Sequence, residues 1–122
     1  MNSRLKKARK EAEKRRVDEV VRHFFLCVGP DCISSKEGEK LWSHLKKRLS
    51  DVKEQSPDGR LYRSKVGCLR ICEQGAVGVV YPDGTWYAGL DKDGIDRVVD
   101  EHLMEGRRVE DLVIGQGKQG SR

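Results

Sequence analysis

Four cysteines occur in this chain, and they form two close pairs that lie far apart in the sequence. Cys27 and Cys32 stand in the run FLCVGPDC, whereas Cys68 and Cys72 stand in GCLRICEQG. Paired thiols of this kind bind metals, form disulfides or carry out thiol redox chemistry. A centre shared by all four sulfurs would require the two pairs to meet in space, and this requirement restricts the folds that the chain can adopt.

Apolar runs and turn signals predict the elements around the first pair. Residues 22–28 are short, aromatic and branched, which favours a buried strand ending at a Gly-Pro step. A helix should follow to about residue 50, because Ser34 and Glu37 have capping-box spacing and leucine recurs at every fourth position from residue 41. Residues 60–66 alternate apolar and charged side chains and predict a second strand.

The second half of the chain predicts a hairpin and a helix. Residues 76–81 and 85–90 read as strands and flank a Pro-Asp-Gly turn. Asp93 should cap a last helix, and Gly106 should end it.

The order of these elements is β-α-β followed by β-β-α. The first strand, helix and second strand should form a right-handed parallel crossover, and the hairpin should extend the sheet antiparallel. This arrangement predicts an α/β fold of the thioredoxin-like βαβ-ββα type, with a mixed four-stranded sheet. Because parallel neighbours end at the same edge of a sheet, the loops that hold the two cysteine pairs should emerge together.

Charge separates an N-terminal arm from this domain. Residues 1–16 hold eight Lys or Arg and two Glu, and the whole chain has a formal net charge of +5, so the remainder is nearly neutral. We expect a basic, partly helical arm over residues 1–21, a folded domain over residues 22–114 and a disordered tail over residues 115–122.

No stretch approaches the roughly 20 apolar residues that a membrane-spanning helix needs, and the first apolar run lacks the pattern of a signal peptide. We therefore expect a cytoplasmic protein, in which paired cysteines more often bind metal or perform redox chemistry than form structural disulfides.

The spacing of the pairs, C-x4-C and C-x3-C, leaves three kinds of centre open. A binuclear iron–sulfur cluster needs two sulfurs for each iron, which two loops with one pair each could supply. Structural zinc sites usually contain C-x2-C, and thiol oxidoreductases of the thioredoxin type need C-x-x-C, so neither is favoured. The spacing of plant-type ferredoxins does not fit.

Longer runs carry a more specific signal. The segments GCLRICEQG, AVGVVYPDGTWYAG and DGIDRVVDEHLMEGRRVEDLVI resemble the thioredoxin-like [2Fe–2S] ferredoxins, over about residues 22–114. The cysteine spacing is also similar to that of the cluster domain in the small subunit of bacterial NADH:quinone oxidoreductase. The resemblance implies a [2Fe–2S] cluster bound by four ligands, one-electron transfer with redox partner proteins, and often a homodimer. The implied ligands are Cys27, Cys32, Cys68 and Cys72.

We therefore expect an iron–sulfur electron carrier and not an enzyme, since the chain has no phosphate-binding glycine loop and no nucleotide-cofactor fingerprint. The basic arm lies outside the resemblance and should attract an acidic surface of a redox partner, whereas nucleic acid is not the expected partner. The alternative is a zinc-stapled binding module that uses the arm on nucleic acid or an acidic partner.

A few other residues carry expectations of their own. Arg70 stands between the second pair of cysteines, where a small residue is common in the family that the chain resembles. The three histidines, at positions 23, 44 and 102, should lie at the surface or its boundary, and Trp42 and Trp86 should belong to the core.

Overall fold

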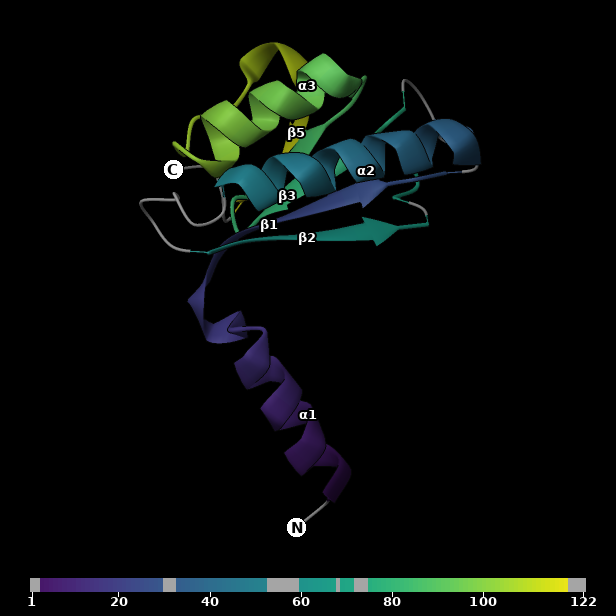
Figure 1. The fold of residues 1–122 in the computed structure, drawn as a ribbon. Coiled ribbons are helices and arrows are strands. Elements are labelled where there is room, and N and C mark those ends of the chain that lie inside the picture. Colours follow the sequence, from purple (N-terminus) through teal and green to yellow (C-terminus); the bar gives the residue numbers. More distant parts are fainter. Residues whose placement is uncertain (1–2, 30–32, 53–59, 68, 72–74, 119–122) are drawn as a thin grey trace.

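The computed structural model describes residues 3–29, 33–52, 60–67, 69–71 and 75–118 (Figure 1). In chain order the elements are α1 Ser3–Lys14, a 3-10 turn Val17–Glu19, β1 Val20–Cys27, α2 Ser35–Val52, β2 Arg60–Val66, β3 Gly78–Tyr81, β4 Thr85–Tyr87, α3 Lys92–Arg97, a π-helical segment Val98–Leu103 that continues α3, a 3-10 turn Glu110–Leu112 and β5 Val113–Gln116.

The strands form one mixed sheet in the order β2-β1-β3-β4-β5. β1 pairs in parallel with β2 and antiparallel with β3, and the remaining pairs are antiparallel. The helix α2 connects β1 to β2, so the parallel crossover and the antiparallel hairpin are both present. The predicted α/β class is therefore confirmed.

The prediction of four strands is wrong, because residues 113–116 add β5 to the outer edge of β4. The side chain of Gln116 helps to attach this segment to the sheet. It accepts a hydrogen bond from the Thr85 hydroxyl (2.8 Å) and donates one to the Asp83 carbonyl (2.6 Å). Gly115 and Gln116 thus belong to the sheet and not to a tail, and residues 119–122 lie outside the described part of the chain.

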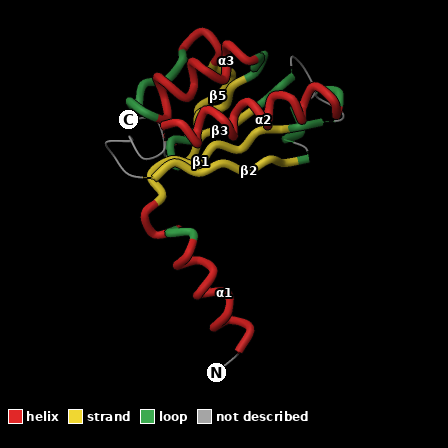
Figure 2. The backbone as a smooth tube through the Cα atoms, viewed as in Figure 1, coloured by secondary structure: helices red, strands yellow, loops and turns green. Residues whose placement is uncertain are grey.

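The helices α2 and α3 cover the same face of the sheet (Figures 1 and 2), and the core lies between them and the strands. The leucines that recur along α2 all point into this core. They pack against side chains from β1, β2, β3, β4 and the α3 region, and the buried cluster includes Phe24, Leu26, Leu41, Leu45, Leu49, Leu61, Val80, Tyr87, Ile95, Val98, Val99 and Leu103. Burial of each such side chain stabilises the fold by about 1.5–3 kcal/mol before entropy is counted.

The other face of the sheet is left open by these two helices (Figure 1). Trp86 points to this face and is half-buried, because strand alternation directs its neighbours Thr85 and Tyr87 toward the helices. The prediction of a core position is therefore wrong for Trp86. Trp42 does pack against the core, as expected, from the side of α2.

The arm is helical, as predicted, but it stands away from the domain (Figure 1). None of the residues of α1 is buried. The first strand begins at Val20, two residues before the expected start, so Val20 and Val21 belong to the sheet and not to the arm. Within the described residues, no helix combines the length and apolar character that crossing a membrane would need.

Local signals set the helix ends. The hydroxyl of Ser34 accepts a hydrogen bond from the Glu37 amide (3.2 Å), which confirms the predicted start of α2. The cap of α3 is Asp91 and not Asp93, since the Asp91 carboxylate accepts from the Gly94 amide at 2.8 Å. Gly106 has φ +77° and ends the helical segment, as predicted.

His102 departs most clearly from the sequence expectation, because its side chain is fully buried. Its Nε2 lies 2.5 Å from an Asp83 carboxylate oxygen, and its Nδ1 lies 2.8 Å from the Tyr87 hydroxyl. A carboxylate only accepts, so Nε2 carries the proton and Nδ1 accepts from Tyr87. The Tyr87 oxygen also accepts from the Val109 amide (3.0 Å), so both nitrogens of His102 and the Tyr87 hydroxyl have hydrogen-bond partners.

Burial governs the ionisation of this network. Desolvation lowers the pKa of His102, although the hydrogen bond to Asp83 acts in the opposite direction. Desolvation also raises the pKa of Tyr87 to about 12. Burial therefore favours the neutral form of His102. His23 and His44 are half-buried, in line with the expectation of boundary positions.

We predict that Tyr87→Phe lowers the free energy of unfolding by about 1–3 kcal/mol, because it leaves the Val109 amide and His102 Nδ1 buried without partners. Urea unfolding at pH 7 measures the change. Tyr81→Phe is the matched control, since Tyr81 is 44% exposed and its hydroxyl should contribute less than about 0.5 kcal/mol. Equal stabilities of the two variants would contradict this account.

Candidate metal centre

Cys27 is the last residue of β1, and its side chain is 2% exposed. In the parallel pairing it stands opposite Val66, the last residue of β2. The Cys27 amide donates to the Val77 carbonyl (2.9 Å), and the Val28 amide donates to the Val66 carbonyl (3.0 Å). The prediction that both strands end at the same edge of the sheet is thus confirmed (Figure 1).

The described residues also show how the segment of the second pair approaches Cys27. The Cys27 sulfur lies 3.9 Å from the carbonyl oxygen of Gly67, the residue directly before Cys68 in the sequence. Val77, which bonds to the Cys27 amide, belongs to the chain that returns from this segment into β3. Three of the predicted ligands, Cys32, Cys68 and Cys72, lie outside the described residues, so their positions stay predictions.

Close backbone contacts fix the chain after Cys27. Gly29 has φ +87°, and a Cβ atom at this position would lie 1.9 Å from the Ile33 carbonyl oxygen. A Cβ atom on Gly38 would lie 2.4 Å from the Val28 carbonyl oxygen. Glycine is required at both positions, and the contact of Gly38 places the first turns of α2 beside the cysteine-bearing edge. The positive end of the helix dipole of α2 therefore lies on the side of the sheet where negative thiolates would gather.

Gly67 behaves differently from Gly29. Among the described residues, no atom lies within 4 Å of the place that a Cβ would take at Gly67.

Arg70 is exposed and has φ +68°, in the left-handed region that favours glycine. This backbone conformation gives a physical reason for the small residue that is common at this position in the family that the chain resembles. It also puts a cationic residue in the segment between Cys68 and Cys72.

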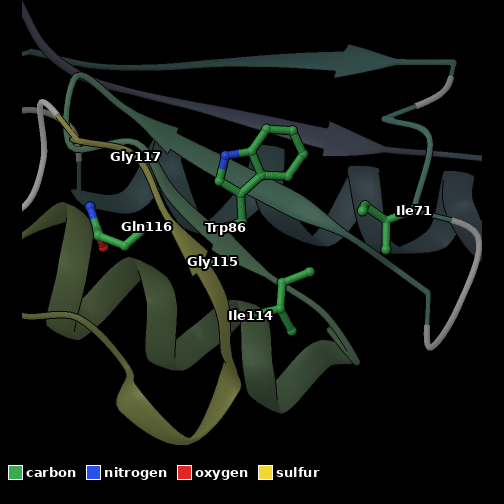
Figure 3. Close-up of a pocket in the computed structure, with 6 residues that line it drawn as sticks. All are labelled: Ile71, Trp86, Ile114, Gly115, Gln116 and Gly117. Carbon is green, nitrogen blue, oxygen red and sulfur yellow. The ribbon is translucent and has the colours of Figure 1, made fainter.

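An apolar surface pocket of about 320 Å³ lies next to the same segment (Figure 3). Ile71, Trp86 and Ile114 supply its hydrophobic wall, and the backbone of β5 closes it. Ile71 and Ile114 are 38% and 49% exposed. No sequence pattern above indicated this pocket. The one pattern that points toward it is the alternation of Trp86 with the inward-facing Thr85 and Tyr87, which places Trp86 on the open face of the sheet.

The described residues fit a thiolate-bound centre. Cys27 offers a buried sulfur whose polar contact within the described part of the chain is a weak one to a carbonyl, so its thiol forms no strong hydrogen bond there. Hydrogen bonds from the backbone amides of Cys27 and Val28 to the carbonyls of Val77 and Val66 hold the chain in place around this sulfur. These are the features of a ligand held in place before its metal binds.

Comparison with known proteins agrees with this geometry. No family model matches the chain. A 2Fe-2S ferredoxin of Aquifex aeolicus (strain VF5) is 33% identical over 102 residues, which cover 80% of this chain and 92% of the relative. A 2Fe-2S ferredoxin of Clostridium pasteurianum is 31% identical over 98 residues, which cover 75% and 94%.

The solved structure of a thioredoxin-like [2Fe–2S] ferredoxin from Aquifex aeolicus superposes with a TM-score of 0.68 at 28% identity, over 83% of this chain and 96% of that chain. Sequence and fold therefore agree with the family that the cysteine-containing runs resemble. This chain belongs to the thioredoxin-like [2Fe–2S] ferredoxins, electron carriers and not enzymes.

Proposed function

We propose that this ferredoxin binds its [2Fe–2S] cluster through Cys27, Cys32, Cys68 and Cys72, and transfers one electron at a time to redox partner proteins. The contact between the Cys27 sulfur and the Gly67 carbonyl carries the proposal, because it brings the first cysteine to the residue that precedes the second pair. The cluster supplies the electron transfer itself, by taking up and releasing one electron.

The residues around Cys27 have a positioning role. The amides of Cys27 and Val28 already donate to Val77 and Val66, so they fix the sulfur and are not free to bond to it. Burial of Cys27 keeps water from this ligand, and the dipole of α2 favours negative charge at this edge. The zinc-stapled alternative has no observation in its favour, and metal analysis distinguishes it.

We predict that anaerobically purified protein contains about two iron and two sulfide per chain, and that Cys→Ser at any of the four cysteines removes or alters its visible spectrum. Leu26→Ala is the control for Cys27→Ser, since both residues are buried in β1. This control should lower stability by about 2–5 kcal/mol and keep the spectrum of the folded protein. Stoichiometric zinc without sulfide would contradict the proposal, and an unchanged spectrum would remove the affected cysteine from the ligand set.

We predict that Arg70→Gly lowers the reduction potential by an amount on the order of 10–30 mV. A nearby cation stabilises the more negative, reduced cluster, so its removal disfavours reduction. Arg70→Lys keeps the charge and should leave the potential almost unchanged. Arg107→Gln removes an exposed cation elsewhere on the surface and should also leave the potential almost unchanged. Potentiometry that shows no change, or a rise, for Arg70→Gly would refute the electrostatic role.

The open face of the sheet is rich in aromatic rings. His23 stacks on Phe25 with ring centroids 4.0 Å apart, and it meets the edge of Tyr62 at 4.9 Å. Phe25 also contacts the ring of Tyr81, which is 44% exposed. Trp86 extends this surface toward the apolar pocket.

We propose that this open face packs against a second copy of the chain. The surface is continuous across β2, β1, β3 and β4, and the helices already cover the opposite face, so a second copy would bury the rings that the fold leaves exposed. The dimer would also bring the pocket beside Ile71 into or near the interface.

Sedimentation equilibrium should therefore show a dimer for the wild-type protein and a monomer for the double variant Tyr81→Lys, Trp86→Lys, with the visible spectrum kept in both. Leu5→Lys is the control, because Leu5 is equally exposed (45%) but lies on the arm. A monomeric wild-type protein, or a double variant that stays dimeric, would end the proposal.

We also propose that the basic arm attracts an acidic surface of the redox partner. The arm joins the sheet at the start of β1, whereas Cys27 ends that strand of eight residues. The two points are therefore roughly 23 Å apart, so the arm acts at a distance from the cluster edge.

We further propose that the protein works in the cytoplasm, where reducing conditions preserve thiolate ligands. Recovery of the native protein outside the cytoplasmic fraction would contradict this location.

A further inference from the structure

A second surface feature lies at the end of the sheet that is remote from Cys27. It is a groove of about 410 Å³ between the last turn of α1 and the first half of β2. Its lining comes from both elements and consists of Glu11, Lys14, Arg15, Arg60, Leu61, Tyr62 and Arg63. The arm is therefore one wall of a groove, and the domain is the other.

The groove is strongly cationic. Four of its lining residues are Lys or Arg, and Glu11 is the one acidic side chain among them. Glu11 already pairs with Lys14 at 3.2 Å and approaches Arg15 to 4.0 Å. The acid is thus paired within the arm, and the lining as a whole holds more cationic than acidic side chains.

Arg63 gives the domain wall a fixed cation. Its guanidinium carbon lies 5.3 Å from the centre of the Trp42 ring, an arrangement that holds the group over the aromatic face. The Arg63 Nε atom is buried and has no hydrogen-bond partner among the described residues. Arg63 also lines the groove, so an acidic group that entered the groove would meet a guanidinium able to form a charge-assisted hydrogen bond.

One wall of the groove is an edge strand, which can pair with an extended chain. β2 is the edge strand of the sheet and pairs only with β1 in the described part of the molecule. The groove runs past four consecutive residues of this strand, Arg60 to Arg63. An edge strand presents alternating backbone donors and acceptors, which an extended peptide can match and a phosphodiester chain, having only acceptors, cannot.

We propose that the groove between α1 and β2 binds an extended acidic segment of a protein partner. This inference deepens the proposed role of the arm and rests on it, but it does not depend on the identity of the cluster ligands. Because the groove and the cysteine-bearing edge lie at opposite ends of the strands, a partner could be tethered here while the cluster edge stays open for electron transfer.

Binding of a fluorescein-labelled hexaglutamate peptide to the full-length, cluster-loaded protein tests the proposal, by fluorescence anisotropy at low ionic strength. The double variant Lys14→Gln, Arg15→Gln should weaken binding about tenfold. Its matched control, Lys6→Gln, Lys7→Gln, removes the same charge from the same arm but outside the groove, and should weaken binding about threefold or less. The helix α1 buries no residue, so neither variant should unfold the domain.

A third variant tests the domain wall. Arg63→Gln should weaken peptide binding about fivefold or more, whereas Lys46→Gln, an exposed cation of α2, should leave it nearly unchanged. The visible spectrum and the melting curve report whether Arg63→Gln remains folded. If it does not, the arm variants still decide the outcome.

Three results would overturn the inference. Equal losses of peptide affinity in the two arm variants would show that the arm attracts the peptide through its overall charge and that the groove is not the binding site. Tighter binding of a hexathymidine oligonucleotide than of the peptide would assign the surface to nucleic acid, and absence of peptide binding by the wild-type protein would remove the site. Anisotropy does not depend on the cluster, so each result is separate from the iron and sulfide analysis.

Discussion

The parallel pairing of β1 with β2 is the constraint on which the site depends. It sets Cys27 opposite Val66 and brings the Gly67 carbonyl to 3.9 Å from the Cys27 sulfur. Residues that are forty positions apart in sequence thereby meet at one edge. The helix α2 is what makes this possible, because a parallel neighbour requires a crossover, and Gly38 lets that helix pack directly on the chain after Cys27.

The two ends of the sheet contain different groups of residues. The cysteine-bearing edge gathers the ends of β1 and β2, whereas the opposite end contains the junction with the arm and the turn that holds Asp83. The contacts of Asp83, His102 and Tyr87 connect the two ends, since Tyr87 pairs with Gly78, which in turn pairs with Leu26 beside Cys27. The cations of the arm lie beyond the opposite end, so the proposed attraction of a partner acts at a distance from Cys27.

Much of the fold was predictable, because local signals agree with tertiary packing. The cap at Ser34, the leucine period of α2 and the strand over residues 60–66 all appear where the pattern indicates. The misses have physical causes. β5 depends on the side-chain bonds of Gln116 to β4 and its turn, and burial of His102 depends on Asp83 and Tyr87, which no local pattern reveals. Of the candidate ligands, the cysteine runs indicated all four, and the structure positions Cys27.

We propose that both cysteine pairs hold one binuclear cluster at this edge, and iron X-ray absorption of the purified protein distinguishes such a cluster from a single metal ion. The iron should be coordinated by sulfur alone and should have a second iron as its nearest metal neighbour. In the Cys27→Ser variant, a lighter oxygen or nitrogen ligand should enter the iron shell or the iron should be lost. Iron without an iron neighbour in the wild-type protein, or a sulfur shell unchanged by Cys27→Ser, would contradict the account.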